Sequence, residues 1–419
     1  MKSDILIIGG GGREHTIVWA LLKSPNCGKV YCAPGNAGIS EIAECVDISV
    51  MDFDNIIEFV KVKAIDLVVV APDDPLAGGL VDLLESEGIR AFGPRKNAAI
   101  IEASKSFSKE LMRKYNIPTA AYEVFTDYQK AISYISLAKF PLVIKADGLA
   151  LGKGVIICNN LAEGQKALQE MMLDNVFGKS GNKVVIEEFM TGPEVSVLSF
   201  CDGKTVIPMV SAQDHKRALD NDMGLNTGGM GTFAPSKAYT EKIATEAMRT
   251  IIEPTVKAMS AEGRPFKGVL YFGLMLTADG VKVVEYNARF GDPETQVILP
   301  LLANDLLEVF EAVIDERLET IKFKWKKESA VCVVLASGGY PSKYAKGLPI
   351  TIKDVDKDIM LFHAGTSKKN GQLVTNGGRV LGVTAVSKDI ESARKKAYAN
   401  VKKIEFSDMH YRLDIGIKL

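Results

Sequence analysis

The first hundred residues alternate between short runs of β-branched and apolar residues and longer segments with apolar residues at helical spacing. Strand-like runs occur in DILIIGG, KVYCAPGN and DLVVVAP, and helical patterns occur in EHTIVWALLKS and PLAGGLVDLLESEG. This alternation is typical of βαβ units around a parallel sheet. The sequence therefore predicts a Rossmann-like N-terminal domain over residues 1–104.

The pattern changes after residue 104. FPLVIKADGLALGKGVIICNN has two apolar runs joined by a glycine-rich bend, and it predicts an antiparallel hairpin followed by a helix at about 161–174. KVVIEEFMTGPEVSVLSFCDG and GVLYFGLMLTADGVKVVEYNARF both follow the order strand, turn, strand. We expect an α+β region of mainly antiparallel sheets over residues 105–325.

The last segment begins after a basic stretch, KFKWKKES, which we interpret as a linker. Beyond it, AVCVVLASGGYP, LFHAGT and GGRVLGVTAVS have strand patterns, and IESARKKAYANVKKI has a helical one. These elements predict a small α+β domain over residues 326–419. A chain of 419 residues is too long to fold around a single hydrophobic core. The predicted fold class is therefore α/β and α+β, in three domains.

The composition is that of an ordinary globular protein, with 47% hydrophobic and 25% charged residues. The 51 basic and 52 acidic residues nearly cancel, so no overall field favours nucleic acid or membrane, and an anionic ligand must be held locally. The N-terminal apolar run, ILII, is too short for a signal peptide or a membrane span. We expect a cytoplasmic protein.

The cysteine and histidine content argues against disulfides and zinc. None of the six cysteines forms a CxxC pair, and most lie in apolar, strand-like contexts, so we expect reduced thiols in the core. The four histidines include no pair at a metal-binding spacing.

The glycine cluster in IIGGGGREH follows a strand and precedes a helix. A dinucleotide fingerprint fails here, because the third glycine of GxGxxG falls on His15 and VYCAPGN ends without an acidic residue. Glycine amides before a helix N-terminus still bind phosphate or carboxylate. A tight turn without ligand is the alternative, but four consecutive glycines cost chain entropy. We favour an anion site.

The bend in KADGLALGKGV is too short for a Walker A loop, because only three residues separate Gly148 from Gly152, and Gly154 stands where a hydroxyl is needed. Its glycine amides could cover a polyphosphate while Lys145 reaches the phosphate oxygens; a solvated hairpin is the alternative. Downstream, Glu187 and Glu188 end an apolar strand and Glu194 begins the next. Such a hinge suits a purine and its ribose, although a solvated surface is the simpler interpretation.

The strand in VVEYNARFGDPETQ carries the strongest local signal. Because side chains alternate along a strand, Glu285, Asn287 and Arg289 should point the same way. Carboxylate and amide oxygens suit magnesium, and the arginine can neutralise a transferring phosphoryl group. A solvated strand face is the alternative. Asp292 and Pro293 predict an N-cap and the first residue of a helix.

The order of these features resembles the ATP-grasp superfamily and, within it, the phosphoribosylamine–glycine ligase family. The similar stretches, which run from residue 9 to about 382, are GGREH, APGNAG, EASKSFSKELMRKYNIPTA, IKADGLALGKGV, IEEFMTGPE, QDHKRALDNDMGLNTGGMG, RFGDPETQ, FHAGT and NGGRVL. The resemblance implies ligation of glycine to 5-phosphoribosylamine through glycyl phosphate, with ATP cleaved to ADP and phosphate, in de novo purine synthesis. It implies a lid subdomain at about 122–190, ATP as co-substrate, Mg²⁺ or Mn²⁺, small-molecule partners only, and a monomer or weak dimer.

The resemblance also implies roles for individual residues. Those expected to bind ATP are Lys105, Lys145, Gly152, Lys153, Gly154, Glu187, Glu188, Phe189 and Glu194. The metal would lie on Glu285 and Asn287, and the catalytic residues would be Arg289, Asp214, Lys216 and Arg217. Residues expected at the glycine and phosphoribosylamine are Gly10, Gly11, Gly12, Arg13, Asn36, Asp73, His215, Asn226, Gly228 and Gly229.

Two departures concern the site. Gly273, a glycine that the glycine ligase family tends to have, stands where many ATP-grasp enzymes carry a further acidic metal ligand, and Ala71-Pro72-Asp73 replaces the Gly-Pro-Glu common in that family. Two other functions remain open: another ATP-grasp ligase or biotin carboxylase-like enzyme, and a nucleotide-binding regulator without turnover. The stretches QDHKR and RFGDPETQ argue against the first, and the full set of charged groups argues against the second.

Overall fold

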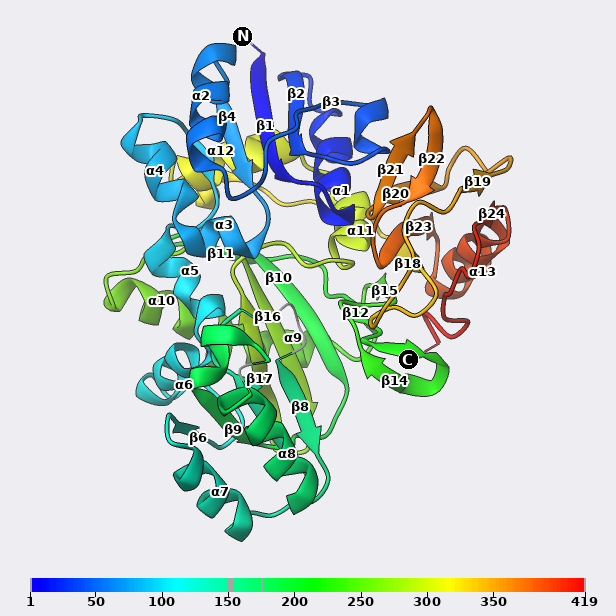
Figure 1. The fold of residues 1–419 in the computed structure, drawn as a ribbon. Coiled ribbons are helices and arrows are strands. Elements are labelled where there is room, and N and C mark those ends of the chain that lie inside the picture. The colour runs from blue at the N-terminus through cyan, green and yellow to red at the C-terminus, as the bar shows by residue number, and fades with distance from the viewer. Residues whose placement is uncertain (1, 150–153, 175, 418–419) are drawn as a thin grey trace.

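The N-terminal part of the computed structural model is a parallel sheet of five strands in the order β3-β2-β1-β4-β5. The structure describes residues 2–149, 154–174 and 176–417 (Figure 1). The strands are β1 (Ser3–Gly9), β2 (Cys27–Pro34), β3 (Glu44–Cys45), β4 (Leu67–Val70) and β5 (Ala91–Phe92), and the helices of this part are α1 (Gly12–Leu21), α2 (Phe53–Lys63), α3 (Asp73–Gly78) and α4 (Leu80–Ser86). β4 is buried along its whole length, as expected for a strand covered on both faces. The predicted Rossmann-like architecture is confirmed.

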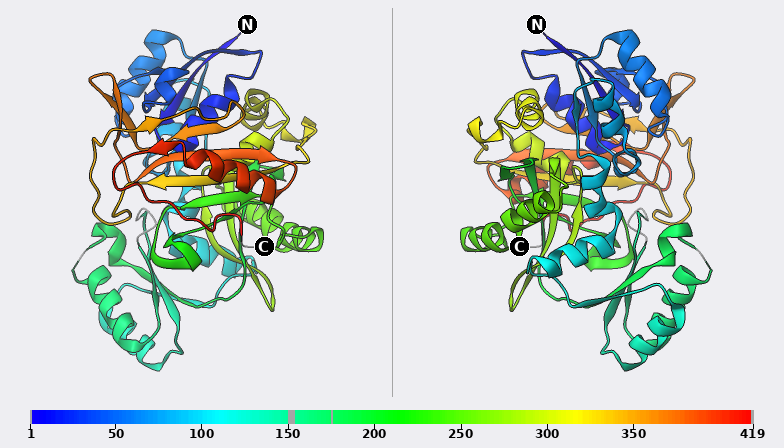
Figure 2. Two further views of the ribbon diagram at one scale, coloured as in Figure 1. Left: turned by 90° about the vertical axis from the view of Figure 1, so that its right-hand side faces the viewer. Right: turned by 90° about the vertical axis from the view of Figure 1, so that its left-hand side faces the viewer.

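The lid is an antiparallel sheet in the order β6-β9-β7-β8. Its elements are β6 (Tyr122–Phe125), α7 (Tyr128–Leu137), β7 (Leu142–Ala146), β8 (Val155–Cys158), α8 (Leu161–Met172) and β9 (Val184–Glu188). The hairpin of β7 and β8 and the helix after it are as predicted. The lid projects from the lower end of the molecule (Figures 1 and 2). It has its own apolar core, which includes Ile135, Ile144 and Leu168.

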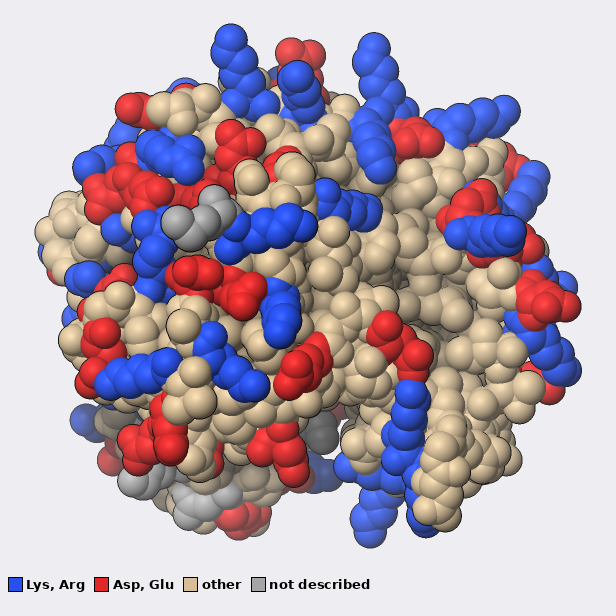
Figure 3. Space-filling view, turned by 90° about the horizontal axis from the view of Figure 1, so that it is seen from above, with Lys and Arg blue, Asp and Glu red and all other residues tan. Residues whose placement is uncertain are grey.

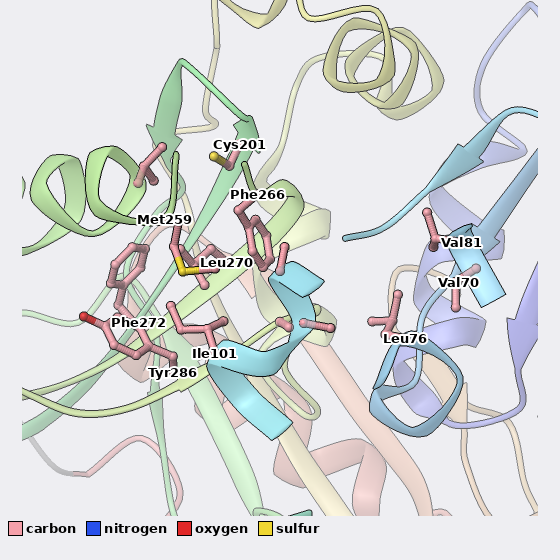
Figure 4. Close-up of a cluster of buried hydrophobic side chains, with 14 of the residues drawn as sticks. Val70, Leu76, Val81, Ile101, Cys201, Met259, Phe266, Leu270, Phe272 and Tyr286 are labelled. Atoms are coloured by element: carbon pink, nitrogen blue, oxygen red, sulfur yellow. The ribbon is translucent and has the colours of Figure 1, made fainter. Parts of the chain in front are cut away.

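The body is a second antiparallel sheet, in the order β11-β10-β16-β17. Its strands are β10 (Glu194–Asp202), β11 (Val206–Pro208), β16 (Lys267–Thr277) and β17 (Gly280–Asn287), and the neighbouring helices are α5 (Lys96–Ala103), α6 (Lys105–Lys114), α9 (Glu241–Ala247), α10 (Glu253–Ala261) and α12 (Leu306–Ile314). Ile101 of α5 lies in one apolar cluster with Leu270 and Phe272 of the body and Val70 and Leu76 of the N-terminal part (Figure 4).

The predicted order strand, turn, strand is confirmed both for β16 and β17, which pair with each other, and for KVVIEEFMTGPEVSVLSFCDG, whose two strands belong to different sheets. β9 is already paired on both sides, with β6 and β7, so it cannot pair with β10. Residues 189–193 therefore carry the chain from the lid sheet to the body sheet.

The C-terminal sheet has the order β12-β15-β18-β23-β20. Its strands are β12 (Gln213–Asp214), β15 (Gly231–Ala234), β18 (Ser329–Ala336), β20 (Met360–His363) and β23 (Arg379–Ser387), and α13 (Ile390–Val401) packs on it. The described residues also form three two-stranded antiparallel sheets. These pair β13 (Arg217–Leu219) with β14 (Met223–Asn226), β21 (Thr366–Lys369) with β22 (Gln372–Thr375), and β19 (Thr351–Ile352) with β24 (Ile404–Glu405). Because β15 pairs with β18, the sheet crosses the boundary placed at 325/326.

The prediction that Asp292 and Pro293 begin a helix is wrong. The short helix α11 (Thr295–Ile298) starts later, with Glu294 at its N-cap. The Asp292 carboxylate makes tertiary contacts instead: it pairs with Arg379 at 3.3 Å and accepts a hydrogen bond from the Arg13 N–H at 3.4 Å.

The general expectations from composition agree with the structure. All six cysteines are free, and five of them are buried. Within the described ranges, no helix is both long and apolar enough to span a bilayer. On the face seen from above, basic and acidic side chains are interspersed, as the nearly balanced charge leads one to expect (Figure 3).

Candidate active site

A cavity of about 1050 Å³ lies between the lid and the body and reaches residues of the N-terminal and C-terminal parts. It brings together most of the predicted site. The predicted residues that line it are Arg13, Asp73, Lys105, Lys145, Gly154, Glu187, Glu188, Phe189, Glu194, Asp214, Lys216, Arg217, Asn226, Gly228, Glu285, Asn287 and Arg289. Gly152 and Lys153 lie outside the described residues.

His215 does not line this cavity, and its placement disagrees with the predicted substrate contact. Its side chain is fully buried, and its ring lies 5.9 Å from that of Phe233. Because side chains alternate along extended backbone, Asp214 and Lys216 face the cavity while His215 faces the core. Gly229 is also outside the lining; its φ is +112°, and a Cβ there would lie 2.4 Å from Cδ of Pro293.

The glycine loop before α1 faces protein carboxylates. The Gly11 N–H donates to Glu14 at 2.6 Å, and the Arg13 N–H donates to Asp292 at 3.4 Å. The Asn36 side-chain amide donates to the Gly10 carbonyl at 2.9 Å. Gly10, Gly11, Gly12 and Asn36 do not line the cavity, and the Gly11 N–H is bonded within the protein; the anion site on the glycine amides stays a prediction. Arg13, in the first turn of α1, does line the cavity.

Where the cavity borders the lid, it contains a buried cluster of two lysines and a glutamate. Glu187 Oε2 lies 3.0 Å from Lys145 Nζ and 3.2 Å from Lys109 Nζ. Lys145 also donates to the Val284 carbonyl at 3.1 Å, which links the lid to the body. Burial lowers the pKa of Lys109 to about 8, although Glu187 opposes this shift. Lys109 is not among the predicted residues, because its role depends on its distant partner.

The proposed metal residues lie side by side on β17. Glu285 is paired across the sheet with Gly273, and a Cβ at Gly273 would lie 3.2 Å from Cγ of Glu285. Glycine at this position therefore leaves room for the carboxylate. Removal from water would raise the pKa of Glu285, but nearby cations, Lys216 foremost, lower it below its usual value. The side chain is a carboxylate at neutral pH.

Two oxygen donors fit a hard divalent cation that keeps water and phosphate ligands. In the described part of the chain, no group of three or more His, Cys, Asp or Glu side chains could hold a metal alone.

Arg289 is held next to this pair by Glu102 of α5. Its guanidinium lies 3.0 Å from Glu102 Oε1 and donates to Asn287 Oδ1 at 3.3 Å. The other Glu102 oxygen accepts from the Ala288 N–H at 2.7 Å. Burial would lower the pKa of Arg289, but the Glu102 carboxylate raises it, so the arginine stays charged. Nothing local in the sequence marks Glu102, which lies 186 residues from Ala288 along the chain.

The charged segment after β12 gives the cavity both signs of charge. Lys216 forms an ion pair with Glu194 and lies 3.8 Å from Glu285. Burial and the nearby Glu294 raise the pKa of Asp214, whereas Lys216 opposes this shift. Arg217 donates to the Gly224 carbonyl at 2.9 Å across the β13–β14 hairpin.

The C-terminal sheet contributes two residues that sequence reasoning missed. Arg379 donates to the carbonyls of Gly228 and Asp292, both at 2.7 Å, and the Gly228 N–H donates to the Tyr340 hydroxyl at 3.1 Å. Both side chains line the cavity. The signal in the sequence is the stretch NGGRVL, which contains Arg379 but to which the resemblance assigns no role.

Three family models match consecutive parts of the chain. They are the N domain of phosphoribosylglycinamide synthetase at residues 3–102, its ATP-grasp (A) domain at 103–295 and its C domain at 330–418. The chain belongs to the phosphoribosylglycinamide synthetase family. A phosphoribosylamine–glycine ligase of Caldanaerobacter subterraneus is 48% identical to this member over 98% of the chain and 99% of the relative.

Solved structures agree with this family and its fold. The phosphoribosylamine–glycine ligase of Thermotoga maritima is 34% identical, with a TM-score of 0.86 over 98% of this chain and 99% of that one. The biotin carboxylase domain of Hydrogenobacter thermophilus 2-oxoglutarate carboxylase, solved with MgADP and bicarbonate, is 16% identical, with a TM-score of 0.75 over 98% and 92% of the two chains. At that identity the second likeness shows the shared ATP-grasp fold only.

Proposed function

We propose that this enzyme joins glycine to 5-phospho-D-ribosylamine, with cleavage of ATP to ADP and phosphate, in de novo purine synthesis. The observation that carries the proposal is the single cavity that unites Lys105 and Lys145 with Glu285, Asn287 and Arg289. Relatives at 47–48% identity over nearly the whole chain bear the name of this ligase.

The chemistry has two steps. A glycine carboxylate oxygen attacks the γ-phosphorus of ATP, and ADP leaves; the amine of phosphoribosylamine then attacks the acyl carbon of glycyl phosphate, and phosphate leaves. No enzyme nucleophile is needed, since the phosphate makes the acyl group reactive. The protein contributes position and charge.

We assign the nucleotide to the space between lid and body. Lys105 and Lys145 contact the phosphates, residues 187–189 the adenine, and Glu194 the ribose. Lys216 pairs with one oxygen of Glu194 in this structure, and the other oxygen can accept a hydrogen bond from the ribose. Lys216 also lies 3.8 Å from Glu285, one of the two proposed metal ligands.

Glu285 and Asn287 would hold Mg²⁺, with Mn²⁺ as a substitute. When bound, this cation supplies positive charge at the phosphates. Arg289 stabilises the acyl phosphate, and Asp214, Lys216 and Arg217 provide charges of both signs for the glycine zwitterion.

The sugar phosphate lies nearer Arg13 and Asp73, which line the same cavity. Consistent with small-molecule substrates, we propose a cytoplasmic monomer or weak dimer, with domains at 1–104, 105–325 and 326–419.

The test measures ADP release with ATP, glycine and phosphoribosylamine, each omitted in turn. We expect release to require all three, and replacement of both Glu285 and Asn287 by alanine to lower it by roughly 100-fold or more. Asp279→Ala, on the β16–β17 turn, is the control that keeps full activity. Release that depends on bicarbonate but not glycine would instead favour a biotin carboxylase-like reaction. Full activity of the folded double variant would refute the assigned site.

A further inference from the structure

The β13–β14 hairpin supplies part of the cavity wall but has little apolar anchorage of its own. Arg217, Asp222 and Asn226 line the cavity. Of its apolar side chains only Ala218 is buried; Leu219, Met223 and Leu225 are 48%, 63% and 58% exposed. An isolated two-stranded hairpin is at best marginally stable in water. Polar contacts must therefore set its position.

Those contacts come from the end of the chain, residues 410–414. Arg412 donates to the Arg217 carbonyl and to Asp222 Oδ1, both at 3.0 Å. His410 Nε2 lies 2.6 Å from the Ala218 carbonyl. The backbone also connects the two segments, since the Leu413 N–H donates to Asp220 at 2.7 Å and the Asn221 N–H donates to Asp414 at 2.9 Å.

Arg412 is the centre of this connection. Its side chain is fully buried, and Asp414 fixes its guanidinium through two hydrogen bonds, Nε to Oδ1 at 2.7 Å and Nη2 to Oδ2 at 2.6 Å. The remaining nitrogen, Nη1, is thereby aimed at the hairpin. A planar guanidinium can serve both partners at once, which a lysine ammonium cannot do in the same geometry.

We propose that Arg412 is a positioning residue for the reaction, acting through the hairpin. It does not line the cavity, yet it fixes the backbone of Arg217 and the side chain of Asp222, which do. The segment from Asp214 to Gly229, where the proposed function places glycine, is thus held by the C-terminal part of the chain. Arg379 and Tyr340 hold its far end at Gly228, and Arg412 holds the hairpin.

The inference rests on the proposed function, and it predicts a selective effect. Loss of Arg412 should weaken glycine use and leave the nucleotide end of the cavity unchanged. We expect Arg412→Ala to raise the KM for glycine at least tenfold and to change the KM for ATP less than twofold. Arg412→Lys should lie between the wild type and Arg412→Ala.

Hydrogen exchange gives a second readout on the same full-length proteins. The amides of residues 219–226 should exchange at least tenfold faster in Arg412→Ala. The control is Lys395→Ala on α13, whose exposed side chain pairs with Glu391 of the same helix. This control should leave both readouts unchanged.

Asp220→Ala keeps the inference testable if Arg412→Ala does not fold. This residue is only partly buried, lies outside the cavity lining and loses one contact, to Leu413 N–H. We expect the KM for glycine and the hydrogen-exchange rates of residues 219–226 to rise about threefold, compared with at least tenfold in Arg412→Ala. An unchanged glycine KM in a folded Arg412→Ala or Asp220→Ala enzyme would overturn the inference. Wild-type enzyme that releases ADP without need of glycine would instead overturn the proposed function, whatever the variants do.

Discussion

Replacement of Glu102 by glutamine tests how Arg289, the proposed catalytic arginine, is held. The change removes the negative charge that lies 3.0 Å from the Arg289 guanidinium but keeps the size of the side chain. It also keeps an oxygen that can accept the Ala288 N–H. Arg289 would then retain hydrogen bonds to the Asn287 side chain and the Phe290 carbonyl but would lose its ion pair with Glu102.

The size of the effect follows from the separation and the burial. Two unit charges 3.0 Å apart attract by about 5 kcal/mol at an effective dielectric constant near 20, and the desolvation of both ions offsets much of this. Leaving one partner of a buried pair uncompensated costs roughly 3–5 kcal/mol, and the glutamine amide keeps the loss near the lower end. A displacement of Arg289 by about 1 Å would lower the rate by about 100-fold.

The assay combines steady-state kinetics with urea unfolding. We expect Glu102→Gln to lower kcat by about 10- to 100-fold, to keep the KM for ATP within twofold, and to lower the free energy of unfolding by about 3 kcal/mol. Glu262→Gln removes a solvent-accessible ion pair with Lys114, and it should not measurably change kcat, the KM for ATP or the free energy of unfolding. A folded Glu102→Gln enzyme with wild-type kcat would refute the argument that Glu102 aims Arg289.

Two further predictions concern stability. Burial and nearby His363 lower the pKa of His15 to about 3, so between pH 6.5 and 3 only the unfolded chain binds this proton, and stability falls as the pH decreases. When the pH is lowered from 7.5 to 5.5, the free energy of unfolding, measured in urea, should fall by about 1.4 kcal/mol less in His15→Gln than in the wild type. An equal fall in both proteins would contradict the lowered pKa of His15. Gly229→Ala should lower the free energy of unfolding by about 1–3 kcal/mol more than Gly263→Ala, because both have positive φ but only the first places a Cβ against Pro293. Equal changes in the free energy of unfolding, measured by thermal denaturation, would show that Pro293 moves aside without cost.

The sequence is informative where function depends on local periodicity. β17 combines an apolar strand with polar side chains on one face, and this alternation correctly predicts that Glu285 and Asn287 lie together in the cavity. The same rule, applied to Asp214, His215 and Lys216, places the His215 side chain in the core and away from the cavity. The prediction for His215 failed because QDHKR has the composition of a charged loop, although its first two residues form β12.

The contacts that position the site could not be read from the sequence in this way. Arg379 meets Gly228 across 151 residues, and Arg412 meets Arg217 across 195. Pairs this distant leave no spacing pattern in a single sequence. A single sequence also does not show whether an arginine is buried or exposed to solvent. Asp292 shows the converse: its local pattern predicts an N-cap, but its carboxylate binds the tertiary partners Arg379 and Arg13.

The distribution of apolar cores indicates which part of the enzyme can move to admit ATP. Ile5 of the N-terminal sheet, Leu198 of the body and Cys332 of the C-terminal sheet belong to one buried cluster, so these parts cannot separate without exposing apolar surface. The buried residues of the lid cluster all lie between Ala131 and Ile186 and belong to none of the other clusters. The lid can therefore swing as a unit about residues 189–193. Such a motion would break polar contacts between the lid and the rest of the molecule, among them Lys145 with the Val284 carbonyl, Glu188 with Lys282 and Asp147 with the Ser106 N–H. Because water can replace polar partners, breaking them costs less than exposing a shared apolar core.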